Sequence, residues 1–157
     1  MIIDRMNAFS LWQPWGSLFF VGPKAKRVET RGWATKIRGE IAIHAAATKQ
    51  GFKLIRAGDP SAYDLIVDAL QDAGYHLWSD LPLGAVLGSA VLVDCVPIEA
   101  LYGSEYDTPI ERAFGDWSPG RYGWIVERAV RYPEPIFAPG SQGIWKWNPP
   151  EGVIRDG

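Results

Sequence analysis

A basic and aromatic stretch near the N-terminus has the composition of a ligand site. Between positions 24 and 38 the chain has six lysine or arginine side chains and a single carboxylate, and the surrounding stretch 10–44 contains three tryptophans. Indole rings stack on flat aromatic ligands, and basic side chains neutralise an anion held beside the ring. We expect at least one of the three indoles to pack in the core. The expected ligand-binding residues of this stretch are Trp12, Trp15, Arg31 and Trp33.

Two residues of the same stretch, Lys26 and Glu29, have side chains suited to acid–base chemistry. A lysine that is partly buried among other cations can give up its proton and act as a base, and Lys26 has such neighbours in the sequence. Glu29 and Arg31 fall on one face of a strand expected over 27–31, where they can pair. The alternative is an ordinary surface strand, in which that ion pair is worth less than about 1 kcal/mol.

Two later segments offer further contacts for an anion or a base edge. Arg121 and Tyr122 lie in the turn SPGRYGW, where an arginine can hold a phosphate or carboxylate through two parallel hydrogen bonds. The loop with Ser141 and Gln142 offers a hydroxyl and backbone N–H groups, although an ordinary turn fits the same residues. His44, in the apolar run IAIHAA, is expected to be buried with its hydrogen bonds satisfied. The remaining tryptophans in the C-terminal half are expected to be packing residues: Trp117, Trp124, Trp145 and Trp147.

Composition restricts the class of protein. A chain of 157 residues that is 47% hydrophobic and 22% charged is typical of one soluble globular domain. Its single cysteine, Cys95, excludes an internal disulfide framework and is expected to be an inert buried thiol. The sequence has no pattern for a metal site, a glycine-rich phosphate loop, a membrane span or a signal peptide. We therefore expect a cytoplasmic protein that needs no cofactor or metal and does not bind membranes.

Charge is unevenly distributed along the chain. The formal net charge is −2, yet residues 59–116 hold eleven acidic side chains and one basic side chain. The positive charge is thus concentrated in the first part of the sequence. This distribution disfavours an extended surface for duplex nucleic acid and allows a small, focused anion site.

The hydrophobic pattern predicts a mixed α+β chain without internal repeats. Helices are expected over 15–21, 60–73 and 107–114, and Asp59 and Pro60 supply the start signals of the longest one. Because helical crossovers do not alternate with the strands, we expect a small, mainly antiparallel β-barrel with two or three helices at its rim. Alternation and turn residues predict strands over 8–12, 27–31, 39–45, 84–98, 122–132 and 144–147.

Several motifs, taken in order, resemble the ASCH (activating signal cointegrator homology) domain. The matching segments are SLWQPWGSLFFVGPKAKRVETRGW, IRGEIAIHAA, FGDWSPGRYGW and PIFAPGSQGIWKW, together with Glu111. The match covers about 10–147, so residues 1–157 are expected to form a single ASCH domain. The resemblance implies a PUA-like barrel of five or six strands whose cleft meets RNA or a nucleobase. Two positions differ from the family pattern, Ile37 in place of tyrosine and Ser141 in place of lysine, and both favour a more selective cleft.

The resemblance implies three possible functions. Some small bacterial members of the superfamily are amidohydrolases that remove the acyl group from N4-acylated cytidine, with a K-x-x-T pattern and a distant glutamate. Here Glu29 stands at the threonine position, and Thr30 is expected on the opposite strand face. In a modified mechanism, Lys26 or Glu29 directs an attacking water molecule and Glu111 acts as a second proton carrier. Glu105 is the alternative to Glu111 in that role.

We favour this hydrolase of an amide C–N bond, acting on a small-molecule nucleoside. The first alternative is a non-catalytic module that binds single-stranded RNA or a modified base. The second is a ribonuclease in which Lys26 assists phosphodiester cleavage.

Overall fold

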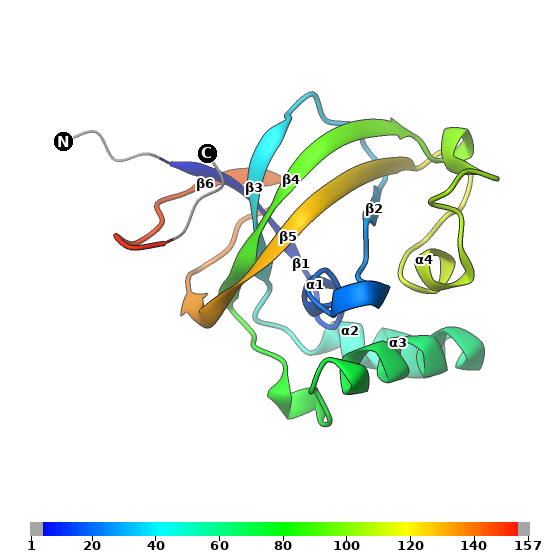
Figure 1. The fold of residues 1–157 in the computed structure, drawn as a ribbon, viewed down its shortest axis with the longest axis horizontal. Coiled ribbons are helices and arrows are strands. Elements are labelled where there is room, and N and C mark those ends of the chain that lie inside the picture. The colour runs from blue at the N-terminus through cyan, green and yellow to red at the C-terminus, as the bar shows by residue number, and fades with distance from the viewer. Residues whose placement is uncertain (1–4, 154–157) are drawn as a thin grey trace.

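One sheet of six strands organises the molecule, and the computed structural model describes residues 5–153. The strands are β1 (Met6–Leu11), β2 (Val28–Arg31), β3 (Gly39–Ala45), β4 (Ala85–Pro97), β5 (Tyr122–Phe137) and β6 (Ile144–Trp147). Their order in the sheet is β2-β5-β4-β3-β1-β6. All neighbouring pairs are antiparallel except β1 with β3, which is parallel. Figure 1 shows β4 and β5 as the long, curved strands that cross the sheet.

The sheet remains open. β2 and β6 end the strand order without pairing with each other, so the α+β class is confirmed and the expected closed barrel is wrong. Each of these edge strands has only four residues; β2 pairs with β5, and β6 pairs with β1. A closed barrel needs a ladder at this position. No such ladder joins β2 to β6, and the guanidinium of Arg31, at the end of β2, instead donates to the backbone oxygen of Ser10 in β1 at 2.9 Å.

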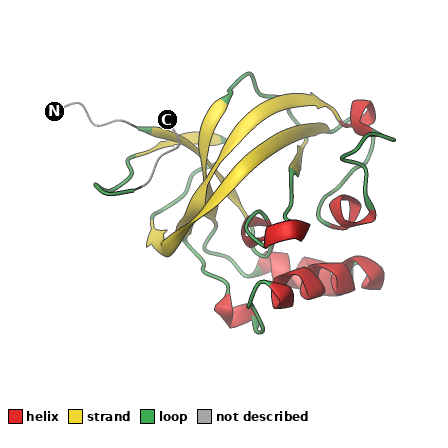
Figure 2. Ribbon diagram, viewed as in Figure 1, coloured by secondary structure: helices red, strands yellow, loops and turns green. Residues whose placement is uncertain are grey.

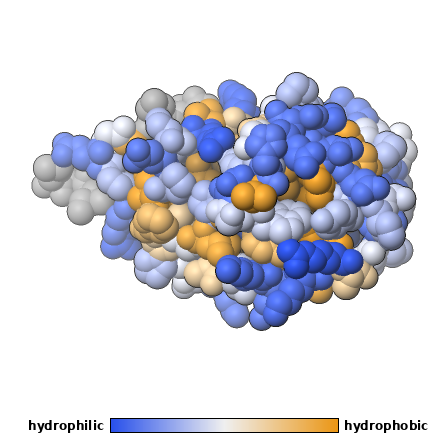
Figure 3. All heavy atoms as spheres, turned by 90° about the horizontal axis from the view of Figure 1, so that it is seen from below, coloured by the Kyte–Doolittle hydropathy of each residue, from blue (hydrophilic) through white to orange (hydrophobic). Residues whose placement is uncertain are grey.

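Four α-helices lie along one side of the sheet within residues 5–153, where two or three had been expected (Figure 2). They are α1 (Trp15–Leu18), α2 (Gln50–Ala57), α3 (Pro60–Asp72) and α4 (Pro109–Ala113). The start of α3 is as expected, because Pro60 occupies its first turn and the Asp59 carboxylate accepts from the N–H of Ser61 at 3.0 Å. The molecular face on the helix side mixes hydrophilic and hydrophobic residues (Figure 3).

Two glycines are needed where backbones pack closely. A Cβ at Gly51 in α2 would lie 2.0 Å from the carbonyl oxygen of Gln13. A Cβ at Gly88 in β4 would lie 2.2 Å from the carbonyl oxygen of Val130, beside a shift in the pairing register of β4 and β5. Gly88 therefore lies where the pairing of β4 with β5 is irregular.

Two main apolar clusters hold these layers together. The first lies against the sheet, around Trp124, and the second joins α1, α2, α3 and α4 around Phe114. Both aromatic residues are completely buried. Trp15 packs against both clusters and so connects the helices to the sheet. Cys95 is half-buried, rather than fully buried as expected, because the end of β4 extends beyond the core.

Candidate functional site

Two adjoining clefts open where the sheet fails to close. The larger, here called the tryptophan cleft, has a volume of about 630 Å³ and the smaller, the arginine cleft, about 360 Å³. Their common wall is formed by Ser10, Trp12 and Arg31. The tryptophan cleft is further lined mainly by Trp33, His44 and the loop 138–143. The arginine cleft is further lined mainly by Trp15, Glu29, Thr30, Gly115, Asp116 and Arg121.

Two exposed indoles line the tryptophan cleft. Trp12 is 39% exposed and Trp33 is 42% exposed, whereas Trp124, which contacts Trp33, is completely buried. Trp33 is held from below, because its ring meets that of Trp124 edge-on at 4.8 Å and its carbonyl accepts from the Trp124 indole N–H. Large apolar rings that are fixed but left in solvent are typical of binding surfaces.

Arg31 is oriented for a role in both clefts. Its Nε donates to Glu29 Oε2 at 2.8 Å, and its Nη2 donates to the backbone oxygen of Ser10. The guanidinium also lies over the rings of Phe9 and Trp124, with its carbon 5.5 and 5.7 Å from their centroids. These contacts immobilise the arginine while Nη1 donates to no acceptor within the described residues.

Lys26 is buried behind the arginine cleft and lines neither of the two clefts. Its side chain is fully buried, and Nζ donates to the carbonyl oxygens of Val28 and Phe114 at 2.7 and 2.9 Å. The third neighbour is the carboxylate of Glu29, with Oε1 at 3.5 Å. An ammonium group has three N–H donors, and three acceptors surround this one.

Glu29 connects the buried lysine to the arginine of the cleft. Its Oε1 faces Lys26 and its Oε2 accepts from Arg31, so the three side chains form a continuous row of charges. Glu29 and Thr30 both line the arginine cleft, although alternation along the strand predicts opposite faces. Thr30 belongs to an edge strand, and its backbone also contributes to the arginine cleft, because its carbonyl oxygen accepts a hydrogen bond from Arg121. Its hydroxyl accepts from the N–H of Asp116 at 3.1 Å.

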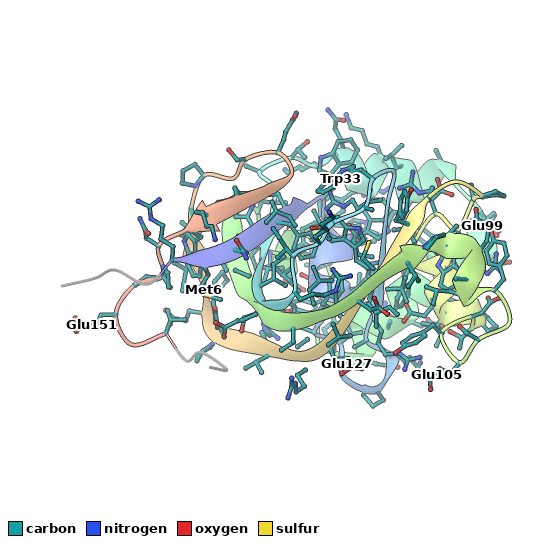
Figure 4. The ribbon with its side chains drawn as sticks, turned by 90° about the horizontal axis from the view of Figure 1, so that it is seen from above. Met6, Trp33, Glu99, Glu105, Glu127 and Glu151 are labelled. Carbon is teal, nitrogen blue, oxygen red and sulfur yellow. The ribbon has the colours of Figure 1, made fainter. Side chains whose placement is uncertain are left out.

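Glu111 lies outside both clefts. It is buried in the first turn of α4, where its carboxylate accepts from the N–H groups of Arg27 at 2.8 Å and Val28 at 3.3 Å. Burial raises the pKa of Glu111, while Lys26 and the two N–H groups oppose that shift. Glu105, its rival in the sequence, is exposed and lies on the opposite side of the molecule from Trp33 (Figure 4).

The other sequence-predicted residues are divided between the clefts and the core. Arg121 lines the arginine cleft, 3.7 Å from Asp116, and the pKa of Asp116 is lowered by hydrogen bonds from the hydroxyl and N–H of Ser118. Ser141 and Gln142 line the tryptophan cleft and are exposed. Tyr122 instead packs against the first apolar cluster.

A serine–histidine pair in the tryptophan cleft was not selected from the sequence as a site. Ser10 Oγ lies 2.9 Å from His44 Nδ1, and His44 Nε2 lies 2.7 Å from the carbonyl oxygen of Ala138. The indole N–H of Trp145 donates to the same serine oxygen at 3.2 Å. His44 is 2% exposed, as expected for a buried, satisfied histidine. The parallel pairing of β1 and β3 places Ser10 opposite His44, and no local sequence pattern reveals that pairing.

Comparison with known proteins places the chain in a family. The model of the ASCH domain matches residues 9–136. The chain belongs to the ASCH domain family. It is 34% identical over 87 residues to human activating signal cointegrator 1, a match that covers 55% of this chain and 14% of that protein. This chain therefore corresponds to a small part of its curated relative.

Solved ASCH structures are similar at low sequence identity. The ASCH protein of Zymomonas mobilis is 17% identical with a TM-score of 0.46, covering 84% of this chain and 73% of that one. A mutant form of it is 16% identical with a TM-score of 0.44, covering 84% and 75%.

Within residues 5–153 no group of three or more histidine, cysteine, aspartate or glutamate side chains is placed to hold a metal ion. No helix in that range is long and apolar enough to cross a membrane. The side chains that line the two clefts can stack on a ligand, form hydrogen bonds and ion pairs with it, and transfer protons.

We expect this ASCH domain to become less stable as the pH decreases, because of His44. Burial lowers the pKa of His44 below its ordinary 6.5, although the hydrogen bond to Ala138 opposes this shift. Between the lowered pKa and 6.5 the unfolded chain binds a proton that the folded chain does not, so the free energy of unfolding decreases as the pH falls through this window.

Denaturant titrations at about pH 7.5 and about pH 5.5 measure this effect as a loss of stability in the wild type that His44→Gln does not show. Glu111 contributes with the opposite sign, because its raised pKa removes stability as the pH rises above 4.5. Both proteins carry Glu111, so its contribution cancels in the comparison. Equal pH dependence in the two proteins would contradict the assignment.

Proposed function

We propose that this ASCH domain binds a nucleobase, as a free nucleoside or within single-stranded RNA, in the tryptophan cleft. The observation that carries the proposal is the pair of exposed indoles, Trp12 and Trp33, in one cleft with the fixed guanidinium of Arg31. A flat base stacks on such rings with a gain of about 1–3 kcal/mol per base. The cleft volume of about 630 Å³ lies within the range of small-molecule sites.

The arginine cleft supplies the neighbouring anion site. The lining of this cleft holds two arginines, Arg31 and Arg121, and two carboxylates, Glu29 and Asp116. The ammonium of Lys26, buried behind Glu29, adds one positive charge. That balance fits one phosphate or carboxylate and not a long nucleic-acid backbone. The ligand that uses both clefts is one nucleotide unit, with its base against the indoles and its phosphate near Arg31 and Arg121.

For the reaction, we propose hydrolysis of the amide of an N4-acylated cytidine-type base. The support is the hydrogen-bonded pair of Ser10 and His44 in the wall of the tryptophan cleft, together with the enclosed carboxylate of Glu29 in the arginine cleft. Of the three residues first considered for catalysis, Glu29 alone lines one of these two clefts. In this proposal Lys26 positions Glu29, and Glu111 holds the strand that carries both.

Binding of the base is tested with the two indoles. We expect Trp12→Ala and Trp33→Ala each to weaken the binding of cytidine monophosphate, or of a short single-stranded RNA, by about 1–3 kcal/mol, measured by calorimetric titration. Phe137→Ala is the matched control, because this aromatic ring is 82% exposed and lines neither cleft. Unchanged affinity in both tryptophan variants would remove the proposed site.

Salt dependence separates one nucleotide from an extended RNA surface. For a single phosphate contact the affinity should fall about threefold for a fourfold rise in salt. A decline of several orders of magnitude would indicate many contacts and favour RNA binding over a larger surface. Incubation with N4-acetylcytidine, followed by ultraviolet absorbance, tests the hydrolysis directly.

A further inference from the structure

The hydrogen bonds around Ser10 determine where its proton lies. The carbonyl of Ala138 can only accept, so the nitrogen of His44 beside it, Nε2, carries a hydrogen. In a neutral imidazole the other nitrogen, Nδ1, then has the free lone pair. Because the Trp145 indole can only donate, its N–H is directed at Ser10 Oγ, and the Ser10 hydroxyl is left to donate to His44 Nδ1.

We propose that Ser10 is a nucleophile with His44 as its base, and that the pair transfers an acyl group from a ligand in the tryptophan cleft to water. The inference rests on the proposed nucleobase function only for the identity of the leaving group. A hydroxyl within hydrogen-bond distance of a base that a third group orients is the arrangement of an activated nucleophile. Here the third group is the carbonyl of Ala138.

Burial keeps His44 in the form that this role needs. The imidazole is 2% exposed, and burial lowers its pKa, so it is neutral and able to accept a proton at pH 7. Once protonated on Nδ1, the ring still donates from Nε2 to Ala138. Trp145 fixes the ring from the side, with the two planes at 85° and their centroids 5.4 Å apart. Ser10 itself is half-buried and lines both clefts.

The loop that covers the pair supplies hydrogen-bond donors for a developing oxyanion. Its backbone packs directly on the pair, since a Cβ at Gly140 would lie 2.6 Å from His44 Cε1 and 2.7 Å from Ser10 Oγ. The backbone N–H groups of residues 140–143 donate to no acceptor within the described part of the chain. Free N–H groups beside a nucleophile are the donors that stabilise a tetrahedral intermediate.

The proposed reaction proceeds through an ester of Ser10. Ser10 Oγ attacks the acyl carbonyl carbon while its proton moves to His44 Nδ1, and the carbonyl electron pair moves onto oxygen. Collapse of this intermediate breaks the bond from the acyl carbon to the leaving amine or alcohol, which takes the proton from Nδ1. Water then attacks the ester with His44 again as base, which releases the carboxylic acid and restores the Ser10 hydroxyl.

The test uses p-nitrophenyl acetate as the acyl donor, which requires no nucleobase. We expect peptide mass spectrometry to show acetylation of Ser10 in the wild type about 10²–10⁴-fold faster than acetylation of Ser141, the exposed serine of the same cleft. Ser61→Ala, at an exposed serine that lines neither cleft, should leave the rate at Ser10 unchanged. His44→Gln should reduce it to the rate of Ser141, with circular dichroism confirming that the variant is folded.

The outcomes separate the inference from the proposed function. Acetylation of Ser10 no faster than that of Ser141 overturns the nucleophile, and cytidine monophosphate that still binds then leaves the nucleobase function intact. Fast acetylation of Ser10 in a protein that binds no nucleotide supports the nucleophile and removes the nucleobase function. The wild-type measurement decides between them even if a variant fails to fold.

Discussion

Replacing Lys26 with alanine should destabilise the fold by about 3–5 kcal/mol, because it breaks a buried ion pair and leaves one partner uncompensated. The side chain is fully buried, and Nζ serves the carbonyls of Val28 and Phe114 as well as the carboxylate of Glu29. In the variant all three acceptors lose this donor, and the space of a long side chain is left empty. Urea denaturation measures the loss as a lower midpoint with an unchanged slope.

Lys24 provides the control for this experiment. Its ammonium also pairs with a carboxylate, Asp72, at 2.9 Å, but the two side chains are 45% and 64% exposed. An exposed pair of this kind adds little to stability, so Lys24→Ala should change the free energy of unfolding only slightly. A stable Lys26→Ala protein that no longer binds or converts its ligand would instead show that Lys26 acts in the site.

Glu111→Ala should also destabilise the domain, by about 1–3 kcal/mol for each backbone N–H left without an acceptor. The carboxylate accepts from Arg27 and Val28, and Val28 is completely buried. These bonds attach α4 to the beginning of β2, the strand that carries Glu29 and Arg31 into the clefts. We therefore expect reduced ligand affinity together with the lower thermal midpoint, since the edge strand loses its support.

The matched variants for Glu111 separate structure from catalysis. Glu111→Gln keeps one carbonyl oxygen as an acceptor, so its loss of stability should be smaller than that of the alanine variant. Glu105→Ala removes an exposed carboxylate from the same region and should leave stability within about 0.5 kcal/mol of the wild type. If Glu111→Gln is as stable as the wild type and inactive, Glu111 is catalytic and the structural explanation fails.

Local patterns predicted most of the elements, and long-range geometry accounts for the errors. The strand that contains Ile41 and Ile43 follows from alternation, and the helix after Asp59 follows from capping; both signals depend on neighbouring residues. Helix α2 was not predicted because Gly51 weakens its helical signal, although close packing against Gln13 requires that glycine. Closure of the barrel depended on pairing between β2 and β6, and no local pattern reports whether distant edge strands meet.

The site shows the same division. The indoles of Trp12 and Trp33 and the guanidinium of Arg31 could be selected by residue type, and the fold brings all three to one cleft. Lys26 has cations as neighbours in the sequence but two carbonyls and a carboxylate as neighbours in space, so its surroundings differ from those expected. Ser10 and His44 are 34 residues apart, and only the parallel strand pairing reveals their contact.

The position of Arg31 in the common wall has a thermodynamic consequence for the two clefts. A group that binds in one cleft and holds this guanidinium changes the free energy of binding in the other, and the coupling must be equal in both directions. A ligand that fills both clefts then gains or loses affinity relative to its separate parts by that same coupling free energy. Because Arg31 lines both clefts, ligand binding in the tryptophan cleft and ligand binding in the arginine cleft are linked equilibria.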